Sequence, residues 1–128
     1  MPQPSSARRP AALSDGAVVT KAVLRAAGLL QVPQKTLSRV IGVSEATVSR
    51  MSAGTYTLSP QDKAFELAVL FVRLFRALDA ISGGDDTVAR TWLRNANAAL
   101  GDAPITRIES VTGLVDALAY LDARRALV

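Results

Sequence analysis

The sequence predicts an all-α fold for this chain of 128 residues, and three observations support the prediction. Apolar residues recur at helical spacing in the segments between the Pro and Gly breaks. A Ser or Asp that can cap a helix precedes most of these segments. No segment shows the alternation of apolar and polar residues that indicates a β-strand. With 49% hydrophobic and 5% aromatic residues, the expected core is aliphatic.

The first half of the chain predicts three helices after a disordered arm. Residues 1–13 are rich in Pro and Ser and show no periodicity, which is typical of a disordered segment. The three helices are expected between Ser14 or Asp15 and Val32-Pro33, from Gln34 to Ile41, and from Ser44 to about Met51.

The longest helix is expected from Ser59-Pro60 to about Ile81, with Ser59 as N-cap and Pro60 at the first helical position. Gly83-Gly84 would end it. Its apolar residues cover most of its circumference, so we expect burial against its own domain on one side and a partner subunit on the other.

Three further helical segments are expected after Gly84. The first is capped by Asp85 or Asp86 and continues to Leu100, the second is a turn from Pro104 to Glu109, and the third follows Ser110. The predicted units are the arm (1–13), a first domain (14–57), a central helix (58–84) and a C-terminal domain (85–128).

Residues 34–51 have the spacing of a DNA-binding helix-turn-helix. Its two short helices cross at a sharp angle, which requires a glycine at the turn and a small residue where the helices touch. Gly42 and Ser38 occupy these positions. The positions that must be apolar hold Leu37, Ile41, Val43, Val48 and Met51. The structural alternative is a generic helical hairpin.

The charge distribution favours the DNA-binding interpretation. Residues 1–57 hold seven basic and two acidic residues, a net charge of +5, whereas residues 58–128 have a net charge of −1. A polyanion would therefore be attracted to the first half.

The second helix of the unit would lie in the major groove. Arg50 can bind guanine or a phosphate, and Glu45 can accept from cytosine or simply stabilise the helix N-terminus. The predicted DNA contacts are Gln34, Lys35, Ser44, Glu45, Thr47, Ser49 and Arg50. Because this face carries few cations, we expect a dimer on a palindromic site.

Composition argues against enzymatic activity. The chain has no cysteine and no histidine, which removes thiolate metal sites and the commonest general base. No carboxylate pair has a companion that suggests catalysis, so we expect no catalytic residue, metal or cofactor. Met1 to Pro10 is polar and basic, and the longest apolar run, Leu67 to Val72, is too short to cross a bilayer. These features predict a soluble cytoplasmic protein.

The residues of the second half alone indicate a helical dimerisation or partner-binding region. Trp92 is more often a core residue than a contact residue in such a region. A more specific pattern is Trp92 to Gly101, then Pro104, then Ser110-Val111-Thr112-Gly113 followed by Val115 and Leu118.

This pattern resembles the toxin-binding region of Xre/MbcA/ParS-type antitoxins, and the resemblance covers about residues 30–125 together with an Xre-like helix-turn-helix. The resemblance implies a dimeric antitoxin that neutralises a RES-domain, NAD-degrading toxin and represses its own operon. The implied toxin contacts are Trp92, Asn97, Leu100, Gly101, Pro104, Ser110, Gly113, Arg124, Arg125 and Val128. The sequence departs from the family pattern at Asp102 and Ser110, where Gly and Thr are common, and in its last residues, Arg124 to Val128.

Two other functions stay open at this point. One is a stand-alone dimeric helix-turn-helix repressor without a toxin partner. The other is a helical adaptor whose helix-turn-helix no longer binds DNA.

Overall fold

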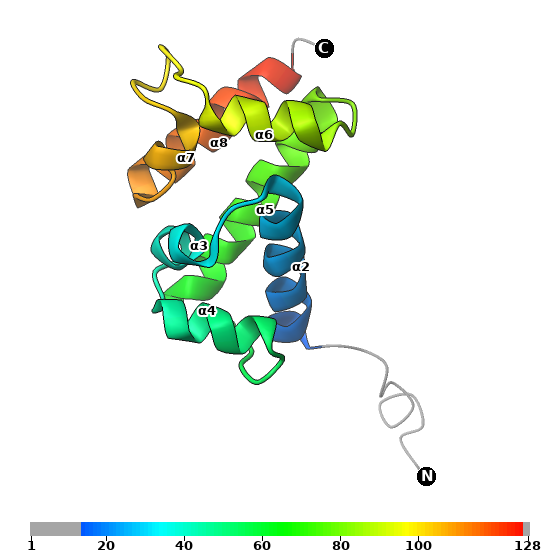
Figure 1. Ribbon diagram of the computed structural model, residues 1–128, viewed down its shortest axis with the longest axis vertical. Helices are drawn as coiled ribbons and strands as arrows, with labels where there is room; N and C mark the ends of the chain where they lie inside the picture. The colour runs from blue at the N-terminus through cyan, green and yellow to red at the C-terminus, as the bar shows by residue number, and fades with distance from the viewer. Residues whose placement is uncertain (1–13, 127–128) are drawn as a thin grey trace.

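The computed structural model describes residues 14–126 and confirms the all-α class. The described residues form seven helices and no strand (Figure 1). They are α2 (Asp15–Leu30), α3 (Gln34–Ile41), α4 (Glu45–Ser52), α5 (Lys63–Ile81), α6 (Asp86–Arg94), α7 (Pro104–Arg107) and α8 (Val111–Arg125). The predicted arm, residues 1–13, lies outside the described residues, as does Val128.

The long helix α5 runs through the middle of the molecule (Figure 1). It packs against α2, α3 and, most extensively, α8. Phe71 and Leu74, near its centre, are completely buried. The predicted burial of this helix is therefore achieved largely by the chain itself, and the expected contact with a partner subunit stays a prediction.

The predicted ends of α2, α3 and α4 are confirmed. Ser14 caps α2 by accepting a hydrogen bond from the backbone N–H of Ala17 at 3.1 Å. Gln31 ends the helix in the left-handed conformation, with φ 55°. These short-range interactions need no tertiary partner, which explains why the sequence predicts them.

The predicted start of α5 is wrong by about one turn. The helix begins at Lys63, with Asp62 in the N-cap position, and Ser59 and Pro60 lie in the preceding turn. The turn is closed by a 2.9 Å hydrogen bond from Asp62 N–H to the Ser59 carbonyl. Its cause lies just upstream, where the N–H of Leu58 donates to the hydroxyl of Thr20 at 3.0 Å. This contact fixes Leu58 on α2, so the chain must turn before it enters α5.

The predicted end of α6 at Leu100 is also wrong. The helix ends at Arg94, and Asn95 is extended, with ψ 146°. The Asn97 side-chain oxygen accepts from the backbone N–H groups of Ala99 and Leu100 at 3.0 and 3.2 Å. An asparagine that bonds its own neighbouring backbone competes with helix formation, and this turn replaces the predicted last helical turn. The Gly83-Gly84 end of α5, before α6, is confirmed.

The last helix begins as predicted. Ser110 caps α8 by accepting from the N–H of Gly113 at 3.0 Å. Gly113 is buried so close to the carbonyl of Arg107 that a Cβ would collide with it. Pro104 is buried at the first position of α7. This arrangement locks α7 against the start of α8.

Two arginines of α6 hold the C-terminal end of α2. Arg90 donates through Nε to the carbonyl of Leu29 at 2.8 Å. Arg94 donates to the carbonyls of Leu30 at 3.1 Å and Gln31 at 2.7 Å. The last carbonyls of a helix have no partner within the helix, so these guanidinium groups satisfy them. We call Arg90 and Arg94 the arginine clamp; it joins the first and second halves of the chain.

Candidate functional site

The turn between α3 and α4 has the geometry of a helix-turn-helix. Gly42 is left-handed, with φ 75°, and its N–H donates to the Ser38 carbonyl at 2.9 Å. Ser38 is 7% exposed, where the two helices meet. Of the five predicted apolar positions, Val43 is half-buried and the others are buried: Leu37, Ile41, Val48 and Met51. The spacing predicted from the sequence thus corresponds to a packed unit.

Three of the predicted DNA contacts form one hydrogen-bonded row along α4. Ser44 caps the helix by accepting from the N–H of Thr47 at 3.0 Å, and the two hydroxyl oxygens are 2.9 Å apart. Arg50 donates from Nη2 to the hydroxyl of Thr47 at 3.1 Å. This row directs the Arg50 guanidinium along the exposed surface of α4.

Glu45 and Ser49 are exposed on the same helix. Glu45 lies in the first turn of α4, where a carboxylate interacts favourably with the helix dipole whether or not DNA is present. Its position is therefore compatible with both of the roles expected from the sequence.

The start of α3 lies next to the end of α4. Gln34 donates from its side-chain amide to the hydroxyl of Ser52 at 3.3 Å, and Lys35 is exposed beside it. No side chain caps α3, since its N-cap is Pro33, so the first N–H groups of the helix are open to an anion such as a phosphate. Sequence reasoning missed Ser52, although it directly follows Met51 in the same motif.

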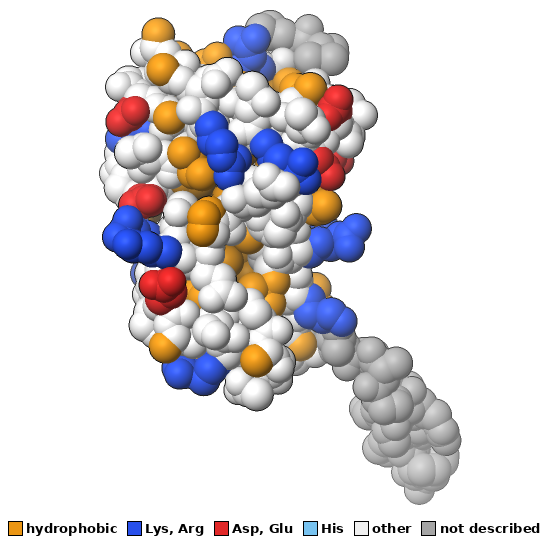
Figure 2. Space-filling view, viewed as in Figure 1, with side chains coloured by type: hydrophobic (Ala, Val, Ile, Leu, Met, Phe, Trp, Pro, Cys, Tyr) orange, Lys and Arg blue, Asp and Glu red, His pale blue; other side chains and the backbone are white. Residues whose placement is uncertain are grey.

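Figure 2 shows Lys and Arg side chains distributed around the visible face, not concentrated over α4. Any binding of DNA by α4 would therefore rest on a few cations, Arg50 among them.

A second candidate surface lies at the other end of α5. The rings of Trp92 on α6 and Tyr120 on α8 stack with centroids 6.2 Å apart and planes at 24°. The Arg124 guanidinium lies 5.4 Å from the Tyr120 ring centroid and donates to its hydroxyl at 3.2 Å. Half-buried Trp92 therefore packs within the protein and also borders the surface.

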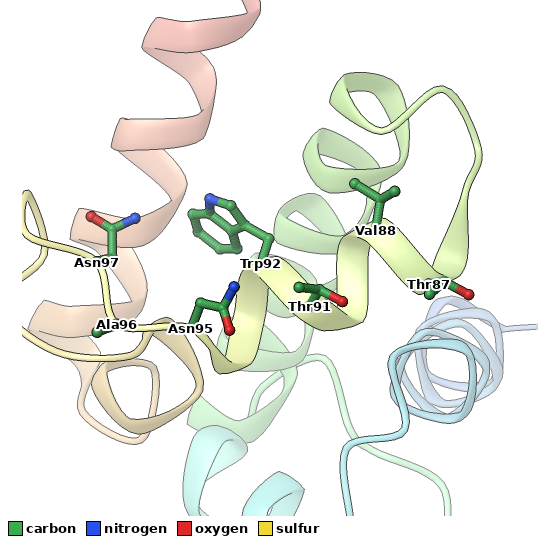
Figure 3. A pocket seen from close by; sticks show the side chains of 7 residues that line it. All are labelled: Thr87, Val88, Thr91, Trp92, Asn95, Ala96 and Asn97. Carbon is green, nitrogen blue, oxygen red and sulfur yellow. The ribbon is translucent and has the colours of Figure 1, made fainter.

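Trp92 separates two pockets. The first, of about 340 Å³, is lined by Thr87, Val88, Thr91, Trp92, Asn95, Ala96 and Asn97 (Figure 3). The second, of about 290 Å³, lies between α5, α6 and α8 and includes Ile81, Tyr120 and Arg124. Sequence reasoning missed Tyr120 and the Thr87, Thr91 and Asn95 row, although this row has a spacing of four residues in the predicted helix.

The other predicted toxin contacts differ in accessibility. Gly101, Ser110, Arg124 and Arg125 are exposed, and Asn97 and Leu100 are half-buried. Pro104 and Gly113 are buried, so their structural contribution is to pack α7 against α8.

In residues 14–126, no group of three metal-ligating acidic side chains is close enough to hold an ion. No helix in this part of the chain combines the length and hydropathy required to cross a membrane.

Comparison with known families matches both halves of the chain. The antitoxin Xre-like helix-turn-helix domain matches residues 9–73. The antitoxin Xre/MbcA/ParS C-terminal toxin-binding domain matches residues 77–126. Both are antitoxin domains, the first with a helix-turn-helix and the second described as toxin-binding. No curated protein matches the chain. The first match ends and the second begins inside α5, so each matched domain includes part of this helix.

Proposed function

The chain belongs to the Xre-type antitoxins, and from this premise we propose that it neutralises a cognate RES-domain, NAD-degrading toxin and represses its own operon. The observation that carries the proposal is the presence of two separate surfaces on one core. The helix-turn-helix of α3 and α4 lies towards one end of α5, and α6 lies at the other (Figure 1). The Trp92–Tyr120–Arg124 stack joins α6 to α8.

The toxin would be held by the surface around α6 and α8. An aromatic residue bordered by polar groups and partly exposed is well suited to anchor a protein partner. Arg125 is exposed at the end of α8, so it can approach acidic residues in a toxin cleft. To bind the toxin, the Arg124 guanidinium would either move away from the Tyr120 ring or bind from its position over that ring. Val128, which lies outside the described residues, is also proposed as a toxin contact.

Operator binding would use α4 in the major groove, with Arg50 as its principal cation. Gln34 and Lys35 would bind a phosphate at the start of α3. Because one Arg50 contributes little affinity, two copies on a palindromic operator are required.

An apolar surface on α2 and α5 favours such a dimer. Val18 is 49% exposed, although it is a large apolar residue. Together with Val19, Ala22, Val69, Val72 and two arginines it lines a pocket of about 220 Å³. Phe65 and Leu70 continue the apolar surface along α5. Burial of these groups against a second copy would release water from a surface that nothing in the described chain covers.

The decisive experiment is co-expression with the protein encoded by the neighbouring gene, measuring growth and cellular NAD. The neighbour alone should arrest growth and deplete NAD, and this chain should restore both. Growth arrest with normal NAD would refute the RES assignment but not neutralisation. A neighbour that is harmless and does not bind this chain would refute the antitoxin proposal. In that case, operator binding in a gel shift would favour the stand-alone repressor.

A further inference from the structure

The surface of α6 that faces away from the core carries two parallel rows of side chains. Thr87, Thr91 and the C-cap residue Asn95 form a polar row, and Val88 and Trp92 form an apolar row beside it (Figure 3). Members of each row are four residues apart, so they lie above one another on successive turns. The opposite face of α6 is buried, through the residues Ala89 and Leu93.

The polar row offers free hydrogen-bonding groups to a ligand. Thr87, Thr91 and Asn95 are all exposed. Asn97 uses its side-chain oxygen on the backbone of Ala99 and Leu100, which leaves its NH₂ group to donate at the end of the row. The groove thus provides donors and acceptors along its length.

The groove is neutral. None of its seven lining residues is charged. Such a lining favours uncharged groups over a carboxylate, phosphate or ammonium, because it supplies no countercharge to offset their desolvation. Backbone amides are uncharged and need both donors and acceptors.

The spacing of the polar row fits an extended backbone. Four helical residues rise by about 6.0 Å. Groups on one side of an extended chain repeat every two residues, or about 6.4–6.8 Å. Successive turns of α6 can therefore reach successive backbone groups along one edge of an extended segment. The backbone of a helical ligand would not use the row, because its N–H and C=O groups are already bonded internally.

We propose that this groove binds an extended segment of the partner toxin, with Thr87, Thr91 and Asn95 bonding alternate backbone groups. An apolar side chain of that segment packs between Val88 and Trp92. This inference rests on the proposed toxin binding and names the kind of toxin element that the groove holds. The groove lies wholly within residues 77–126, which match the toxin-binding domain.

The first test measures the affinity of the full-length chain for the full-length toxin by calorimetry. Thr91→Val keeps the shape of the side chain and removes its hydroxyl, and Asn95→Leu removes the amide. Each should weaken binding about 3- to 10-fold, the effect of losing one hydrogen bond. Thr57→Val is the matched control, since Thr57 is exposed outside the toxin-binding domain.

The outcomes separate the two proposals. If the wild-type chain binds the toxin and both groove variants bind it equally well, the groove proposal is overturned and toxin binding stands. If the wild-type chain does not bind the toxin, the proposed function itself fails.

The second test distinguishes an extended occupant from a helical one. Overlapping synthetic peptides covering the toxin are assayed for binding to the full-length chain, and the peptide that loses affinity for Asn95→Leu is N-methylated at each position in turn. Loss of binding at every second position supports an extended segment. Loss at every third or fourth position, or no peptide that distinguishes the variant from the wild type, overturns the proposal.

Discussion

Removing the arginine clamp should destabilise the whole protein and not only α6. The double variant Arg90→Gln and Arg94→Gln deletes three hydrogen bonds, of 2.8, 3.1 and 2.7 Å, to the last carbonyls of α2. A hydrogen bond from a charged group contributes about 1.5–3 kcal/mol when it is well shielded. Arg94 is exposed and water can replace its bonds, so its contribution must be discounted. We expect a loss of about 2 kcal/mol in the free energy of unfolding, most of it from half-buried Arg90.

The assay is urea-induced unfolding followed by circular dichroism. Lys21→Gln with Arg25→Gln is the matched control, because it also removes two cations four residues apart from an exposed helix surface. The control should change the free energy of unfolding by less than about 0.5 kcal/mol. A clamp variant as stable as this control would refute the reasoning that the carbonyls of α2 depend on α6.

Four further predictions, the first of them a matched pair of glycine variants, concern other parts of the molecule. Gly42→Ala should lower the free energy of unfolding, measured in urea, by about 1–2 kcal/mol. The cause is the backbone φ of 75°, since the new Cβ would meet Leu67 only at 3.7 Å, an ordinary contact distance. Gly28→Ala, in open space on α2, should instead stabilise by about 0.5–1 kcal/mol. Arg50→Ala should weaken operator binding in a gel shift. It should also reduce the steepness of log affinity against log salt concentration by about one for each chain bound. Deleting Arg124 to Val128 should weaken growth rescue against the toxin while sedimentation still shows a dimer. Val18→Glu should shift the sedimenting species towards monomer, since it places a charge on the proposed dimer surface.

Each of these has an outcome that contradicts it. Equal stability of the two glycine variants would show that the turn tolerates a side chain. An unchanged salt slope would exclude an Arg50 contact with phosphate. Full protection by the truncated chain would refute a role of the tail in neutralising the toxin. A Val18 variant that remains dimeric would show that the dimer interface lies elsewhere.

The sequence predicts the features that depend on neighbouring residues. Gly42 ends α3, and Ser44 and Ser110 cap the helices that follow them, because each acts within four residues of its own position. The helix-turn-helix was predictable for the same reason.

The features that the sequence does not predict depend on distant residues or on competing turns. The start of α5 is delayed by the contact of Leu58 with Thr20, 38 residues earlier. In the arginine clamp, Arg90 bonds the carbonyl of Leu29, 61 residues earlier, and no local sequence pattern indicates this contact. At the second surface, Trp92 stands out as the chain's one tryptophan, but its stacking partner Tyr120 is identified only by the packing of α6 near α8.

The sharing of α5 between the two matched domains limits how this family can evolve by recombination. A crossover between residues 73 and 77 would fall within a continuous helix, between Phe71 and Leu78, which are both buried. Under the proposed function, a hybrid formed there would take its operator preference from one parent and its toxin preference from the other. To fold, it must also inherit matching helix faces and an α2 end that accepts the arginines of its new α6. Exchange of specificities is therefore easiest between close relatives, and each lineage should tend to inherit its operator and its toxin together.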